Sequence, residues 1–297
     1  MFDWDDARVF LEAARTGSLN RAALRLGIDP ATVGRRVSRL ESALKSTLLA
    51  RSATGLELTS AGQSFLRAVT QAETAMGAAA EVGQDQPVGT VRISAAEGFG
   101  SVILAPALVD LAAEAPTIRV ELAANSGFLS PSRREVDLAV TLSAPNAARL
   151  DVEPLTDYDL ALYAADDYLA AHGAPRTVEE LHGHRIVGYV DDLLYAQELR
   201  YLDEIAPGLK PHLASSSIRA QREIIAAGGG VGVLPCFLAD GLRRVLPDEV
   251  RLRRRFWLSA HHEVSGAKRV RLVRQWLKTL CARETARLRA PADQAAR

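Results

Sequence analysis

Cysteine and aromatic residues are scarce in this chain, and its net charge is zero. Only two cysteines occur among 297 residues, so a disulfide framework is excluded and ordinary packed thiols are expected. Lys and Arg total 36, and Asp and Glu total 36, so the overall charge indicates no partner. The most apolar run, Ile224 to Leu234, is short and interrupted by glycine, which argues against a membrane span. The acidic first residues do not resemble a signal peptide, and we expect a cytoplasmic protein.

Motifs of the common enzyme classes are also missing. The sequence has no Gly-x-Ser-x-Gly elbow, no Walker sequence and no His-Glu-x-x-His. A glycine-rich run, Gly228 to Gly232, follows a predicted helix and enters a strand, which is the reverse of a dinucleotide loop. Four histidines lack the spacing of a metal site: His182, His184, His261 and His262. We therefore predict no catalytic residue, no metal site and no cofactor.

Positive charge is concentrated near the amino terminus. Between Arg15 and Arg67 there are nine Lys or Arg and three acids, a local excess of six. Such an excess on one small domain suits a nucleic-acid backbone. A solvated basic face is the alternative reading of the same pattern.

Cap residues divide this region into short helices. Asp3 can cap a first helix that ends at Thr16-Gly17, and Ser18 can cap a second over residues 19–26. Asp29 is the N-cap of a third helix whose first residue is Pro30. The apolar positions of the third helix form one buried stripe: Val33, Val37, Leu40 and Leu44.

The face of the third helix opposite this stripe is small and basic. At 100° per residue, Ala31, Arg35, Ser38 and Ser42 point away from the core, with Arg39 on one flank. Small residues beside arginines fit a helix that enters the major groove, where Arg binds guanine or clamps a phosphate. A surface helix with salt-bridged arginines is the alternative.

A longer signature resembles the LysR-type transcriptional regulators. It begins with FLEAARTGSLNRAALRLGI over residues 10–28 and continues as VGRRVSRLE over 33–41. It then includes LLAR over 48–51 and LTSAG over 58–62. The segments YLAAHGAP (168–175) and AGGGVGVLP (227–235) are similar to landmarks of the family's sensing domain.

This resemblance implies a winged helix-turn-helix with its recognition helix beginning at Pro30. The residues it would bring to bases or phosphates are Pro30, Ala31, Thr32, Arg35, Arg36, Arg39, Arg51 and Thr54. Leu56 to Leu58 would form the wing. Gly34 and Arg36 depart from the family's usual serine and glutamine, so the target sequence cannot be borrowed from relatives.

The resemblance also implies a linker helix that pairs two chains. An alanine-rich stretch from residue 59 carries a coiled-coil-like stripe of Phe65, Val69, Ala72 and Met76. Packing of this stripe within one chain is the less favoured alternative. The implied partners are double-stranded DNA, further copies of this chain as a homodimer or homotetramer, a small-molecule effector and RNA polymerase.

Alternating strands and helices after residue 87 predict mainly parallel sheets with helices on both faces. Strand-like runs are 88–94, 118–123, 138–142, 160–164, 185–190, 213–215, 231–234 and 256–261, and helical runs include 102–114 and 218–227. The resemblance implies a two-subdomain α/β fold like that of periplasmic binding proteins. The expected organisation is a head over 1–58, a linker over 59–86 and an effector domain over 87–290. Its subdomains would be 88–162 plus 264–288, and 163–263.

Ligands of open α/β sheets bind at the carboxyl ends of strands, which places the effector in the cleft between the subdomains. The candidate residues are Ala96, Glu97, Gly98, Thr141, Ser143, Tyr189, Val190, Ser215, Ser216 and Ser217. The three serines precede a helix whose amides could hold an anion, although each serine can equally be a plain cap. Our hypothesis is that the effector offers a cation or hydroxyl to Glu97.

Three other classes of protein compete with this interpretation. An enzyme is opposed by the missing motifs. A periplasmic solute-binding protein would share the sensing fold but would have a signal peptide and no DNA head. A DNA-binding architectural protein without a ligand stays open, and saturable binding of a metabolite would separate it from a sensor.

Overall fold

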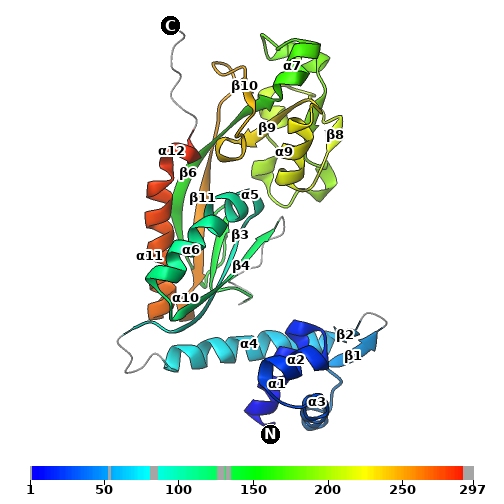
Figure 1. Ribbon diagram of the computed structural model, residues 1–297, viewed down its shortest axis with the longest axis vertical. Coiled ribbons are helices and arrows are strands. Elements are labelled where there is room, and N and C mark those ends of the chain that lie inside the picture. The colour runs from blue at the N-terminus through cyan, green and yellow to red at the C-terminus, as the bar shows by residue number, and fades with distance from the viewer. Residues whose placement is uncertain (1, 53–54, 81–85, 126–130, 132–134, 290–297) are drawn as a thin grey trace. The chain divides into compact units, whose positions relative to one another are not determined.

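The computed structural model describes residues 2–52, 55–80, 86–125, 131 and 135–289. It divides into two compact units, Met1–Val82 and the main part of the remaining chain, Gly83–Ser132 with Val136–Arg297 (Figure 1). Each unit is described by itself below. The helices of the first unit are α1 (Trp4–Thr16), α2 (Leu19–Leu26), α3 (Pro30–Leu44) and α4 (Ser60–Ala80).

The three predicted N-caps of the first unit are confirmed. The Asp3 side chain accepts from the amide of Asp5, and Ser18 accepts from that of Arg21. Asp29 accepts from the amide of Ala31 at 2.8 Å, with Pro30 in the first helical position. Each cap satisfies an amide that the helix itself leaves without an acceptor, which explains why these boundaries could be read locally.

A two-stranded antiparallel wing follows the three helices. It consists of β1 (Leu49–Ser52) and β2 (Gly55–Leu58), paired from Leu49 with Leu58 to Ser52 with Gly55. The Leu56 amide donates to the carbonyl of Gly17 at 3.0 Å. Gly17 has φ of 61°, a left-handed conformation that favours glycine, so the turn after α1 both ends that helix and anchors the wing.

The core of the first unit contains the predicted apolar stripe of α3 and also side chains of α4. Val33, Val37 and Leu40 are buried, and the ring of Phe65 on α4 lies 5.3 Å from that of Phe10 on α1. Val69 is only 2% exposed and packs with α1. The expectation that Val69 faces a second chain is therefore corrected, because α1 of the same chain covers it, whereas Phe65 is only partly covered and its role stays a prediction.

The second unit is built on one nine-stranded sheet. Its order is β4-β3-β5-β11-β6-β9-β7-β8, with β10 paired to β6 off this path. The strands are β3 (Gly89–Ala96), β4 (Ile118–Asn125), β5 (Leu138–Thr141), β6 (Leu150–Ala164), β7 (Ile186–Gly188), β8 (Leu213–Ala214), β9 (Val231–Pro235), β10 (Arg243–Val245) and β11 (Leu252–His261).

Two parallel groups of strands are joined by two long crossing strands. β3 runs parallel to β4 and β5, and β7 runs parallel to β8 and β9. β6 and β11 are antiparallel to each other and pass from one group to the other (Figure 1). The predicted two-part α/β architecture is confirmed. β6 is longer than predicted, and β10 was not predicted.

Helices cover both faces of this sheet. They are α5 (Glu97–Phe99), a π-helical turn (Gly100–Leu104), α6 (Ala105–Glu114), α7 (Asp166–His172), α8 (Leu202–Ile205), α9 (Ile218–Ala226), α10 (His262–Ser265), α11 (Lys268–Arg283) and α12 (Thr285–Leu288). Short 3-10 turns lie at Glu179–Gly183, Asp191–Leu193, Gln197–Leu199 and Cys236–Leu238. The helix predicted from residue 102 begins five residues earlier, so Glu97 opens a helix directly after β3. This helix needs a glycine at position 100. A Cβ there would lie only 2.6 Å from the Cβ of Ala124.

Candidate functional site

The outward face of α3 is the first candidate site. Ala31, Arg35, Ser38 and Ser42 are all exposed, as the helical geometry predicted. The guanidinium of Arg35 donates to the Thr32 hydroxyl at 2.8 Å. Among the described residues no acid forms an ion pair with Arg35, so its charge faces solvent beside small side chains.

The other two arginines of α3 are turned toward α1. Arg39 makes two bonds of 2.6 Å to the carboxylate of Asp6, which is 1% exposed. Arg36 bonds to Asp5, and this bond, ahead of the other charges near it, holds the pKa of Asp5 below its ordinary value. The ion-paired alternative considered for this helix therefore applies to Arg36 and Arg39, which fasten α3 to α1.

The remaining predicted DNA contacts are placed unevenly. Pro30 is exposed at the first position of α3, as expected of a residue whose missing N–H costs nothing there. Arg51 lies in β1, but its side chain lies outside the described residues, and so does all of Thr54.

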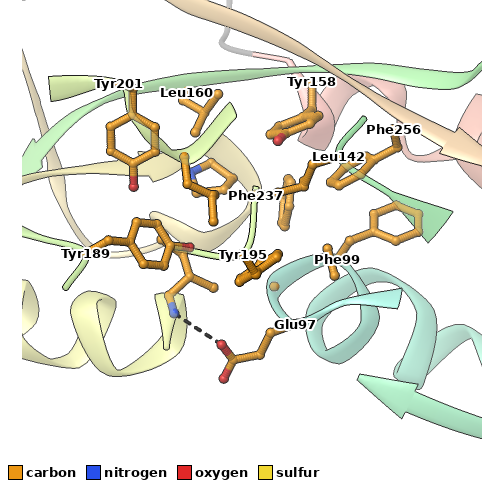
Figure 2. Close-up of a pocket in the computed structure, with 15 residues that line it drawn as sticks. Glu97, Phe99, Leu142, Tyr158, Leu160, Tyr189, Tyr195, Tyr201, Phe237 and Phe256 are labelled. Carbon is orange, nitrogen blue, oxygen red and sulfur yellow. Dashed lines mark hydrogen bonds between the residues drawn. The ribbon is translucent and has the colours of Figure 1, made fainter. Parts of the chain in front are cut away.

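The second candidate site is a pocket in the second unit (Figure 2). It encloses about 370 Å³ of empty space, part of it open to solvent. α5, α9, the crossing strands β6 and β11, and the segment from β7 to α8 contribute side chains. The lining residues are Ala96, Glu97, Gly98, Phe99, Leu142, Tyr158, Leu160, Tyr189, Tyr195, Leu199, Tyr201, Ile218, Pro235, Phe237 and Phe256.

The structure brings four of the ten predicted effector residues to this pocket: Ala96, Glu97, Gly98 and Tyr189. Ser217 lies behind the wall, where it contacts Glu97. The other five, which do not line the pocket, are Thr141, Ser143, Val190, Ser215 and Ser216. Thr141 donates instead to the carbonyl of Ser143 at 2.7 Å, and Leu142 between them faces the pocket.

Glu97 is held at the amino terminus of α9. One carboxylate oxygen accepts the Ser217 hydroxyl at 2.8 Å, and the other accepts the Ile218 amide at 3.1 Å, the bond drawn in Figure 2. Ser217 also caps α9 by accepting from the Ala220 amide at 3.1 Å. Both oxygens thus have partners within the chain. This revises our hypothesis that Glu97 waits for a cation or hydroxyl of the effector.

Aromatic side chains are nearly half of the pocket lining, seven of its fifteen residues, and the sequence predicted only Tyr189 among them. Four of the six tyrosines and three of the seven phenylalanines line it, although aromatic residues are only 5% of the chain. Tyr158 and Phe256 stack with ring centroids 4.1 Å apart. Burial raises the pKa of Tyr158, Tyr189 and Tyr201, and that of Tyr195 to about 12, so these hydroxyls stay protonated. No local sequence pattern marks these residues, because they are scattered along the chain.

Gly98 permits the close approach of α5 to α9. A Cβ at this position would lie 2.9 Å from a methyl of Leu238 and 3.3 Å from Ile218. The glycine therefore leaves room for these two side chains beside Glu97.

Two further features are absent from the described part of the chain. No group of three or more His, Cys, Asp or Glu there could hold a metal ion. No described helix is long and apolar enough to cross a membrane.

A basic helix presented beside a wing, together with a two-part α/β unit that carries a pocket, defines the class of ligand-responsive DNA-binding regulators. Comparison with known proteins gives the family. Residues 4–63 match the family described as bacterial regulatory helix-turn-helix protein, lysR family. Residues 84–282 match the LysR substrate binding domain. The chain belongs to the LysR family of transcriptional regulators, and it is a DNA-binding regulator with an effector-binding domain, not an enzyme.

Curated relatives support this assignment over most of the chain. The HTH-type transcriptional regulator CrgA of Neisseria meningitidis serogroup C is 31% identical over 250 residues, 80% of each chain. The Mau operon transcriptional activator of Paracoccus denitrificans is 27% identical and covers 94% of this chain and 97% of its own.

Solved structures share the fold. The structure of CrgA from Neisseria meningitidis has a TM-score of 0.59 at 25% identity and covers 94% of this chain and 99% of its own. A full-length OxyR variant from Pseudomonas aeruginosa has a TM-score of 0.71 at 18% identity, with 99% of both chains covered. The second likeness concerns the fold alone.

Proposed function

We propose that α3 reads the operator through its outer face, with Pro30, Ala31, Thr32 and Arg35 at the bases. The supporting observation is the difference between the arginines of α3: Arg35 is aimed outward by Thr32, whereas acids of α1 hold the other two. An outward arginine suits bidentate contact with guanine.

We propose that the other predicted DNA-binding residues of the first unit contact phosphates. Arg36 and Arg39 brace α3 against α1 and reach the backbone from its flank, where the Arg39 side chain is 61% exposed. For Arg51 and Thr54 we propose contact with the flanking backbone of the DNA. Charge contacts of this kind position a protein on DNA without specifying its sequence.

The pocket of the second unit is the proposed effector site. Its lining comes from both strand groups and from the crossing strands, so a ligand inside it contacts both parts of the unit. A ligand that fits one arrangement of these parts better than another shifts the balance between them. We propose that this shift modulates DNA binding or activation.

Homo-oligomerisation is proposed through the part of α4 around Met76. Met76 is 54% exposed, and Ala72 lies one turn before it on the same stripe. Pairing there places two heads on one DNA site, and two such pairs form a tetramer. Two relatives are named activators, the Mau operon activator and TtdR of Escherichia coli, and we propose RNA polymerase as a further partner, in the cytoplasm.

Footprinting on the DNA upstream of this gene tests the proposal. The expected result is a protected two-part dyad that persists at a stated, physiological salt concentration. Binding that is strongly salt-sensitive but protects no preferred site would favour the architectural alternative.

A further inference from the structure

The charge of the pocket limits what it can hold. None of its fifteen lining residues is a lysine, arginine or histidine. Its one carboxylate, Glu97, is half-buried and already accepts the Ser217 hydroxyl and the Ile218 amide. An anionic ligand would find no counter-charge in the wall and would meet a fixed negative charge.

The amino terminus of α9 is the place in this pocket where an anion would otherwise be stabilised, since its amides carry partial positive charge. Glu97 occupies that place from within the chain. The same contacts stabilise the carboxylate of Glu97, so the attraction left for a cationic ligand is that of a partly compensated charge.

One fully buried side-chain polar atom among the described pocket residues has no hydrogen-bond partner. Tyr201 is 2% exposed, and its hydroxyl makes no hydrogen bond in the structure. Figure 2 shows this hydroxyl directed inward, toward the ring of Tyr189, whose centroid lies 6.1 Å from that of Tyr201. A buried hydroxyl without a partner is costly, so a ligand oxygen placed there would be bound selectively.

Building on the proposed effector site, we propose that the pocket binds an uncharged aromatic compound whose oxygen pairs with the hydroxyl of Tyr201. Aromatic side chains of the lining pack against its ring, edge-on or offset. The space left between these side chains is small, which limits the compound to about one ring. Glu97 acts as a built-in anion that excludes carboxylates.

Three probes with one ring and different charge test this on the full chain: benzyl alcohol, benzoate and benzylamine. By calorimetry at pH 7, benzyl alcohol is expected to bind at least tenfold tighter than either ion. Tyr201→Phe should weaken benzyl alcohol about tenfold, and Tyr163→Phe, at a tyrosine outside the pocket, should leave it unchanged. Tighter binding of either ion, or benzyl alcohol no tighter than benzoate, would overturn the proposal.

Removing the internal anion gives an independent readout. Glu97→Ala frees the Ser217 hydroxyl and the Ile218 amide, so benzoate should gain at least tenfold while benzyl alcohol changes little. Glu97→Gln, which keeps the size of the side chain, should move benzoate in the same direction. An unchanged benzoate affinity in both variants refutes the role given to Glu97. The footprint of the same preparations reports separately on the proposed function, so a wrong ligand class and a protein that reads no operator give different results.

Discussion

Single residues in the first unit show how space and backbone decide the role of a glycine. Gly34 on α3 departs from the serine usual in the family, yet a Cβ there would meet only a methyl of Leu19 at 3.7 Å, an ordinary contact. Gly62 on α4 is different, because a Cβ would lie 2.0 Å from the carbonyl oxygen of Leu48. Gly34 therefore affects only the helix propensity of α3, whereas Gly62 is required because the backbone of Leu48 lies so close to it.

Replacing these two glycines by alanine should therefore have opposite effects. Gly34→Ala is expected to stabilise the first unit by up to about 1 kcal/mol, since alanine favours a helix over glycine by about that amount. Gly62→Ala should destabilise it by about 2 kcal/mol or more, because the backbone of Leu48 must move. Hydrogen exchange of the α1 and α3 amides in the full chain measures both, and equal shifts of the same sign would contradict the account.

At the scale of elements, structure that depends on neighbouring residues could be predicted from the sequence. Structure that depends on contacts between distant segments could not. The caps at Asp3, Ser18 and Asp29 depend on neighbours two or three positions along the chain, so the sequence specified the head helices closely. The first half of β6 contains acids and Pro154, and it becomes a strand because β11 pairs with it. The aromatic pocket likewise gathers side chains separated by up to 157 positions, from Phe99 to Phe256, which no local pattern could reveal.

Helix α11 provides an element-scale prediction about pH. It packs on the sheet through Glu153 of β6, which accepts from Arg274 at 2.5 Å and from Lys278 at 2.7 Å. Burial works to raise the pKa of Glu153, but these two cations outweigh it and hold the pKa below the ordinary value of 4.5. A carboxyl with a lowered folded-state pKa stabilises the fold above its unfolded value and loses that effect as pH falls through the folded one.

Wild type should accordingly exceed Glu153→Gln in stability by about 1 kcal/mol or less near pH 7, and this difference should shrink as the pH falls below 4.5 and vanish once it has passed the lower folded-state pKa. Urea titrations of the full chain at several pH values, followed by the exchange of α11 amides, would measure it. Because both proteins share every other carboxyl, other titrations largely cancel. A difference that grows on acidification would be incompatible with this role of Glu153.

At the scale of the whole molecule, α4 packs within its own chain at its start, and we propose that it pairs with a second chain farther along. The first turns of α4 are buried against α1 by Phe65 and Val69, while Met76 near its end is exposed. Sequence periodicity assigned the whole stripe to a second chain, since it cannot tell an intrachain partner from an intermolecular one. Val69 is thus covered within the chain, and the part of the stripe around Met76 is the part that we propose for self-association.

Met76→Glu should therefore weaken self-association at least about tenfold, because a carboxylate would be buried in the proposed seam. Gln63→Glu adds the same charge to an exposed position in the first turns of α4 and should leave association unchanged. Sedimentation velocity over a range of protein concentrations distinguishes them. Equal behaviour of the two variants would remove α4 from the interface.

The central claim is that the outer face of α3 reads DNA sequence, and fluorescence anisotropy tests it most directly. The protected site and a scrambled duplex are titrated at one fixed salt concentration with wild type, Arg35→Ala and Arg25→Ala. Arg25 is the matched control, an exposed arginine of α2 in the same unit. We expect Arg35→Ala to lose about tenfold or more on the protected site and little on the scrambled one, with Arg25→Ala near wild type on both. Equal losses on the two duplexes, or none, would contradict the claim.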